Sequence, residues 1–256
     1  MTLLLILLAV LPTIFMIVFI YYKDSYEKEP VGLLVSLFAL GMAGTIPAVA
    51  YETAGDAFIG LFFYKNSGIY NLISAFLGVA LVEEGVKFIA LYFRTWKNPN
   101  YNYKFDGIVY AVLVSLGFAT VENILYVLEG GLSVAIARAL LSVPSHAIDA
   151  VYMGFYYGYA KYYDSVGIVR RRNKNLRMAV IVPVLLHGCY DFLLFENSLI
   201  YLAVFLVFVI VLDVLAVIRI NRSSKKNMQI YKSAVQVYCT NWWFDSNIDI
   251  WLTIIV

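Results

Sequence analysis

Two adjacent glutamates and a lysine lie within a long apolar stretch of this 256-residue chain. The segment Leu81-Val-Glu-Glu-Gly-Val-Lys-Phe88 is in the middle of an apolar run from about residue 69 to residue 93, long enough to cross a bilayer as a helix. Each charged group at the centre of a membrane helix costs about 2.5–3.5 kcal/mol on insertion scales. In a helix, Lys87 is four residues from Glu83 and three from Glu84, so its ammonium group reaches either carboxylate. A helix-packing ion pair explains one glutamate and the lysine, whereas an active site inside the membrane explains all three.

Further polar side chains recur at helical spacing inside the other apolar stretches. They are Glu122, Arg138, His146, Asp149, His187, Asp191 and Asp213, and they include both histidines of the chain. Phe118 and Glu122 are four residues apart, as are His187 and Asp191, and His146 and Asp149 are three apart, so each pair shares one face of a helix. Polar stripes of this kind face the interior of a membrane bundle or a water-filled cavity. The sequence therefore predicts a polar site near the membrane midplane, built by four helices. Asp213 has no partner pattern and is interpreted as a structural or interfacial group.

The elements that position these residues follow from composition. The chain is 62% hydrophobic and 14% charged, with a mean hydropathy of +0.79, whereas a soluble domain carries about 25% charged residues. We therefore expect an all-α, polytopic transmembrane helix bundle. Seven spans are predicted, at about residues 1–22, 31–51, 69–93, 106–128, 132–160, 178–195 and 199–218. Cys189 falls in a span and Cys239 in the polar tail, so no disulfide is expected.

The connecting segments complete this prediction. Residues 52–68 are interpreted as a loop with its own apolar patch at 58–63, residues 129–131 as a tight turn, and residues 161–177 as a basic loop. Pro144 indicates a kink in the over-long fifth stretch. Residues 1–222 are expected to form one transmembrane domain, and residues 223–256 a cytosolic or interfacial tail without an assigned fold.

Lysine and arginine alternate between the two sides of this predicted bundle. They gather in the links after the first, third, fifth and seventh spans, and the links between carry only Lys65. The positive-inside rule then places the protein in the cell membrane with its N-terminus outside and its C-terminus in the cytosol. Membrane topology accounts for the basic runs, so the expected surroundings are the lipid bilayer, and no nucleic-acid partner is expected.

The polar set resembles the PrsW family of bacterial intramembrane proteases. The matching segments are Glu83-Glu-Gly-Val-Lys87, Phe118-Ala-Thr-Val-Glu122, Arg138 through Pro144-Ser-His146, and His187-Gly-Cys-Tyr-Asp191. The resemblance covers about residues 23–194, and it is specific as a set but weak for any single motif. More distantly, the chain is similar to the CAAX prenyl endopeptidase and bacteriocin-processing superfamily. That group usually has an arginine near the position of Lys87 and a histidine near that of Glu122, so the residues here favour PrsW.

The resemblance implies a glutamic-type endopeptidase that makes the first cut in a single-pass membrane protein such as an anti-sigma factor, in a stress response. Either Glu83 or Glu84 would activate water, and the catalytic histidines His146 and His187 would position that water and stabilise the oxyanion. Supporting roles fall to Lys87, which holds the carboxylates, and to Glu122 and Asp191, which orient the histidines. Phe118, Arg138 and Asp149 complete the supporting set.

Three alternatives remain open from the sequence. Two histidines and two glutamates also suit zinc, although no H-E-x-x-H motif is present. The expected cofactor is none, with a zinc-dependent, CAAX-protease-like peptidase as the alternative. Intramembrane Glu, His and Lys residues also relay protons in transporters, but no internal repeat supports a transport protein. A non-catalytic membrane scaffold would keep the same residues for folding.

Overall fold

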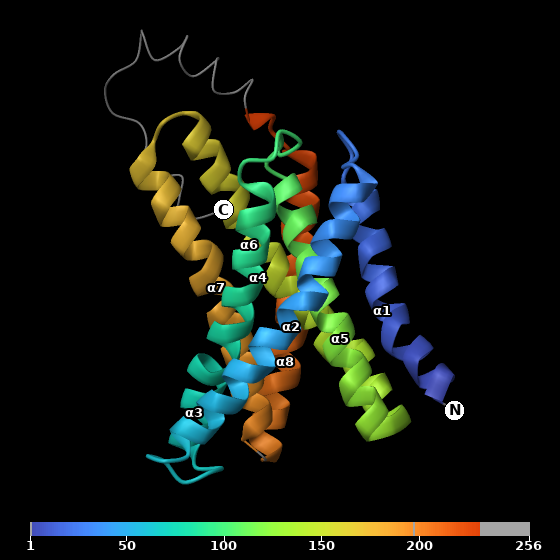
Figure 1. Cartoon of the computed structure of the whole chain (residues 1–256), viewed down its shortest axis with the longest axis vertical. Coiled ribbons are helices and arrows are strands. Elements are labelled where there is room, and N and C mark those ends of the chain that lie inside the picture. Colours follow the sequence, from blue (N-terminus) through green and yellow to red (C-terminus); the bar gives the residue numbers. More distant parts are fainter. Residues whose placement is uncertain (1, 197, 231–256) are drawn as a thin grey trace.

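The computed structural model describes residues 2–196 and 198–230, and within these ranges the protein is an all-helical bundle (Figure 1). The elements are α1 (Thr2–Lys23), α2 (Val31–Ile59), α3 (Gly68–Ile73), η1 (Ser74–Ala80), α4 (Leu81–Thr95), α5 (Asp106–Ala137), η2 (Arg138–Ser142), α6 (Val143–Ser165), α7 (Val169–Phe195) and α8 (Leu199–Lys225). The segments η1 and η2 are π-helical, and each runs directly into the α-helix that follows it. The all-α, transmembrane fold expected from the sequence is confirmed.

Long helices run up and down the bundle axis, joined at alternate ends. The chain reverses within the α5–η2–α6 segment at Gly131, whose φ of 71° and ψ of −154° lie in a region that favours glycine. The two arms then pack together, since Ser115 Oγ donates to the carbonyl oxygen of His146 at 2.8 Å and Arg138 Nε donates to Asn123 Oδ1 at 2.6 Å. The predicted turn at residues 129–131 therefore separates two antiparallel passes.

Five helical stretches of the described chain are long and apolar enough to cross a membrane. One of them, Asp106–Ser165, contains the reversal at Gly131 and so accounts for two passes. The pass formed by α3, η1 and α4 is divided by its π-helical segment. The helices α1 and α8 expose rows of leucine, isoleucine and valine, the surface that a helix presents to lipid.

The first half of α5 forms the centre of the bundle. Every residue from 105 to 120 is buried, which is typical of a helix surrounded by other helices on all sides. Glycines permit the close approach: a Cβ at Gly117 would lie 2.1 Å from the carbonyl oxygen of Phe38 on α2, and one at Gly154 would lie 2.3 Å from that of Gly107. Small residues at helix contacts are the usual means of tight packing in membranes.

Several predicted helix ends are wrong. The helix α2 continues to Ile59 through a segment expected to be a loop, and α7 begins at Val169, so most of the expected basic loop is helical. The last helix reaches Lys225, seven residues beyond the predicted span. In each case the backbone hydrogen bonds of a helix continue past the point where the sequence turns polar. The part of the predicted tail from residue 231 onward lies outside the described residues.

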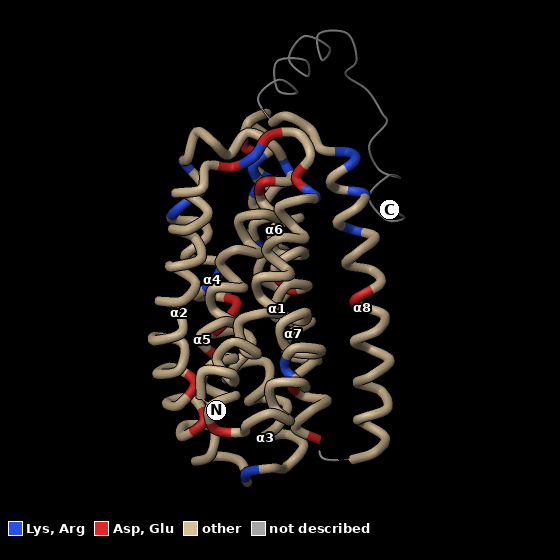
Figure 2. Tube along the Cα trace, turned by 90° about the vertical axis from the view of Figure 1, so that its right-hand side faces the viewer, with Lys and Arg blue, Asp and Glu red and all other residues tan. Residues whose placement is uncertain are grey.

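Basic side chains concentrate at one end of the bundle (Figure 2). This end carries the α1–α2 link, the start of α7 and the end of α8. The opposite end carries the α2–α3 turn with Lys65, the reversal at Gly131 and the α7–α8 link. The arrangement matches the alternation of charge in the sequence.

Candidate active site in the helix bundle

The paired glutamates and the lysine lie in the first two turns of α4 and are buried. Glu83, Glu84 and Lys87 are 3%, 0% and 1% exposed. Lys87 Nζ lies 2.8 Å from Glu83 Oε2 and 2.7 Å from Glu84 Oε1, so the ammonium group pairs with both carboxylates at once. It also lies 3.1 Å from His146 Nδ1 and 4.4 Å from the centre of the Phe118 ring, which adds a cation–π contact. A simple helix-packing pair would not need this second carboxylate or the histidine.

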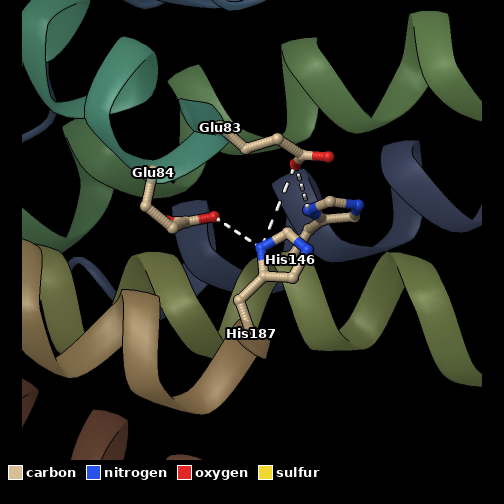
Figure 3. A group of neighbouring side chains, drawn as sticks. All are labelled: Glu83, Glu84, His146 and His187. Carbon is tan, nitrogen blue, oxygen red and sulfur yellow. Dashed lines mark hydrogen bonds and ion pairs between the residues drawn. The ribbon is translucent and has the colours of Figure 1, made fainter. Parts of the chain in front are cut away.

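Both histidines direct Nδ1 toward the glutamates (Figure 3). His187 Nδ1 lies 3.0 Å from Glu84 Oε1 and 4.0 Å from Glu83 Oε2, and His146 Nδ1 lies 4.0 Å from Glu83 Oε2. The imidazole rings are 5.5 Å apart and nearly perpendicular. We call Glu83, Glu84, His146 and His187 the Glu–His cluster.

The other ring nitrogen of each histidine faces a carboxylate. His146 Nε2 lies 2.9 Å from Glu122 Oε2, which also pairs with Arg138 at 3.2 Å. His187 Nε2 lies 3.4 Å from Asp191 Oδ2 one turn along α7. A carboxylate on the outer nitrogen fixes the orientation of an imidazole and raises the basicity of the inner nitrogen. The same arrangement therefore holds both histidines with Nδ1 toward the centre.

Asp149 is the remaining supporting residue from the sequence, and it lies beside His187. Its Oδ2 is 3.8 Å from His187 Nδ1, and this buried atom has no hydrogen-bond partner. The structure thus brings Asp149 and the other nine predicted site residues into one group, in which Glu122, Arg138 and Asp191 are partly exposed and the others are buried. Asp213 lies on α8 and has no ion pair with them among the described residues.

Two neighbours of the site were missed in the sequence. Glu52 belongs to a segment that the sequence predicts to be a loop, but it lies on α2 and interacts electrostatically with Glu83, Glu122 and Lys87. Asn123, which is fully buried, accepts from Arg138 and donates to the carbonyl oxygen of Ala9 on α1 at 2.7 Å. A signal for Asn123 was available, since it is a polar residue next to Glu122 in an apolar stretch. Glu52 could not be recognised as a site residue, because it comes directly after the apolar residues 31–51 that define the predicted span.

Both π-helical segments directly precede residues of the cluster. η1 ends at Ala80, three residues before Glu83, and η2 ends at Ser142, four residues before His146. A π turn holds an extra residue and so rotates the side chains after it around the helix axis. Such turns occur frequently at functional sites. Here they set the direction in which α4 and α6 present their polar stripes.

The cluster is also a suitable donor set for a metal ion. One ligand atom from each of its four residues lies within 4.8 Å of the other three, and all four residues are buried. Two imidazole nitrogens and two carboxylate oxygens are zinc ligands, and a catalytic zinc site leaves one position for water or substrate. His187 Nδ1 lies 3.0 Å from Glu84 Oε1, a contact made either by a proton on Nδ1 or by a cation bound to both atoms. The residues present therefore fit such an ion.

The chain is similar to known proteins over most of its length. Residues 29–217 match the model of the PrsW-protease family, described as "PrsW family intramembrane metalloprotease". The chain is 39% identical to Protease PrsW of Geobacillus kaustophilus over 191 residues, covering 74% of this chain and 79% of the relative. It is 36% identical to Protease PrsW of Bacillus subtilis over 199 residues (77% and 86%) and 35% identical to that of Clostridioides difficile over 211 residues (80% and 85%). No solved structure matches the chain.

The matched region includes every residue of the Glu–His cluster and the carboxylates that hold it. On the strength of the family match and of relatives that are similar over most of their length, the chain belongs to the PrsW family of intramembrane proteases, which are peptide hydrolases.

Proposed function

We propose that this protein hydrolyses a peptide bond of a single-pass membrane protein at the Glu–His cluster. The observation that carries the proposal is the convergence of Glu83, Glu84, His146 and His187 in a buried position, with ligand atoms within 4.8 Å of one another. Four charged or titratable side chains at this depth are costly, and a catalytic role explains why they meet. Peptide hydrolysis needs an activated water, a stabilised oxyanion and a proton for the leaving amine, and carboxylates with imidazoles supply all three.

The metal-dependent form of this proposal has the stronger support. His146, His187 and one glutamate of the pair would hold a zinc ion, which would supply Lewis-acid polarisation of the scissile carbonyl and a water of lowered pKa. The chain's own groups then do the rest. The glutamate of the pair Glu83 and Glu84 that does not bind the metal would take a proton from the water. The same carboxyl group would then return this proton to the leaving amine. Glu122 and Asp191 keep both imidazoles in place during the reaction, since each contacts the Nε2 atom of one histidine.

A metal-free, glutamic form is the second candidate, and the position of Lys87 favours it. Its ammonium group lies 2.7–3.1 Å from Glu84, Glu83 and His146, so the carboxylates are compensated by a charge of the chain itself. One glutamate would then activate water directly. His187, with a carboxylate at each ring nitrogen, would be the proton donor.

The resemblance to the family supports a proposal for the substrate, and the charge pattern supports a proposal for the orientation. With the basic end of the bundle in the cytosol, the N-terminus and the α2–α3 turn lie outside the cell. We propose a membrane-anchored regulatory protein as the substrate. An anti-sigma factor, cut first on its extracytoplasmic side, is the specific expectation that the PrsW family carries.

The test is cleavage of a single-pass reporter by purified protein in detergent, with Glu83→Gln and Glu84→Gln variants. General-base catalysis is typically worth about 10²–10⁴, so at least one variant should lose about 10²-fold or more. Asp213→Asn is the matched control, since it removes a carboxylate of α8 and should keep activity. Cleavage that survives both Glu→Gln changes would remove the pair from the mechanism, and a wild-type protein without cleavage would favour a scaffold or transporter.

Zinc content separates the two forms. In the metal-dependent form, the purified protein binds about one zinc, and His146→Ala and His187→Ala each lower the bound zinc. Chelation then abolishes cleavage and added zinc restores it. A protein that cleaves at an unchanged rate after chelation, with no bound metal, would establish the glutamic form.

A further inference from the structure

A cavity of about 380 Å³ lies beside the Glu–His cluster, at the end of the bundle that carries the α2–α3 turn. Its wall combines the last turns of α2 with the turn itself, α3, η1 and the end of α7. The lining residues that bear on its chemistry are Glu52, Asp56, Lys65, Tyr70, Ser74 and Phe195. None of the four cluster residues lines this cavity. It is therefore a neighbouring space, and its own side chains determine what it accepts.

One of the two acidic groups in the cavity is already neutralised. Asp56 Oδ2 pairs with Lys65 Nζ at 2.8 Å, and Asp56 Oδ1 accepts a hydrogen bond from the Tyr70 hydroxyl. Both members of the ion pair are more than half exposed, so they form the rim of the cavity. This pair also shows that the space admits a lysine ammonium next to a carboxylate of α2.

The other acidic group, Glu52, has no such partner. It lies one turn before Asp56 on α2, and its Oε1 is buried without a hydrogen bond. The charges that act on it are those of the cluster and its supporting residues, namely Glu83, Glu122, Lys87 and His187. Glu52 therefore lies between the cavity and the cluster. Ser74, 8% exposed, adds a second buried oxygen without a hydrogen bond to the same wall.

We propose that this cavity is a substrate subsite for a lysine or arginine side chain next to the scissile bond, with Glu52 as the residue that determines this specificity. The inference rests on the proposed function, because it assumes that a polypeptide reaches the cluster. A cationic side chain gives the unpaired oxygen of Glu52 the charged hydrogen bond that it lacks. A neutral side chain gives Glu52 a weaker hydrogen bond, and an acidic side chain is repelled by its carboxylate.

The experiment uses internally quenched peptides that contain one membrane-spanning sequence and differ at a single position. Lys, Gln or Glu is placed in turn at each position near the scissile bond, and kcat/KM is measured for the wild-type protein, Glu52→Gln and Glu52→Lys. The matched control is Glu129→Gln, because Glu129 is exposed at the same end of the bundle and does not line the cavity. The quantity compared is the ratio of kcat/KM between peptides.

At one position, wild type should prefer Lys over Gln by about 10- to 100-fold, the range of a hydrogen bond to a charged group. Glu52→Gln should bring this ratio close to one, Glu52→Lys should prefer Glu at the same position, and Glu129→Gln should keep the wild-type ratio. A structural role for Glu52 would lower all rates together and leave the ratio intact. If Glu52→Lys does not fold, the ratio in Glu52→Gln decides.

Two results would overturn the subsite: wild-type ratios close to one at every position, or a lysine preference that survives in Glu52→Gln. In both, cleavage itself still occurs, so the proposed function stands. Absence of any cleavage by the wild-type protein overturns the proposed function, and the subsite with it.

Discussion

Replacement of Lys87 by methionine tests the electrostatic structure of the site directly. The two side chains are similar in length, so the change removes the ammonium group with little change in packing. It leaves Glu83 and Glu84, 3% and 0% exposed, without the cation that now lies 2.8 Å and 2.7 Å from them. Removal of one partner from a buried ion pair costs about 3–5 kcal/mol, because a charge remains buried and uncompensated. At about 2–4 °C per kcal/mol for a chain of this size, the melting midpoint should fall by roughly 6–20 °C.

The assay is thermal unfolding of purified protein in detergent, followed by intrinsic tryptophan fluorescence. Lys65→Met is the control, since it removes an ammonium group from an exposed ion pair and should leave the midpoint nearly unchanged. Addition of Glu84→Gln to Lys87→Met removes one of the uncompensated charges and should recover part of the loss. The reasoning is refuted if Lys87→Met melts within about 2 °C of wild type, or if the second change lowers the midpoint further.

Two further predictions concern the basic end and the packing of the bundle. Burial raises the pKa of Glu29, in the α1–α2 link, from 4.5 to about 7, against the lowering effect of its hydrogen bond with Tyr110. The stabilisation from the protonated Glu29 is therefore fully present at a pH below the pKa of this group in the unfolded chain, and it is lost as the pH rises through about 7. Glu29→Gln should therefore flatten the change in melting midpoint between about pH 5 and about pH 8. Gly154→Ala places a Cβ 2.3 Å from the carbonyl oxygen of Gly107 and should lower the free energy of unfolding by about 1–3 kcal/mol. Gly32→Ala is the control, since its Cβ would have no atom within 4 Å and the free energy of unfolding should change little.

The sequence by itself determined the class of the protein and indicated which residues form the candidate site. The sequence shows the four residues of the Glu–His cluster because a charged or titratable group inside an apolar span has a high free-energy cost of insertion, and this placement can be recognised without a structure. Helical spacing then assigned Glu122 and Asp191 to the same faces as Phe118 and His187. The reversal near Gly131 was likewise predictable, since Glu129, Gly130 and Gly131 form a short turn segment between two apolar stretches.

The helix ends were decided by tertiary structure. Hydropathy ends a span where polar residues begin, at about residue 51 in α2, but the helix continues to Ile59 because its backbone hydrogen bonds do not depend on side-chain polarity. The continuation packs against η1, where Gly55 and Gly78 approach each other closely. It carries Glu52 away from the expected loop and to the edge of the cluster.

The partners within the site were also decided by tertiary structure. From spacing alone, Lys87 can reach either glutamate, and the fold makes it contact both, together with His146 from a helix 59 residues away in sequence. Which carboxylate holds which histidine depends on the rotation of α4 and α6, and the π-helical segments η1 and η2 set that rotation. Such contacts are nonlocal, and a single sequence records the residues that make them but not the angles at which the helices meet.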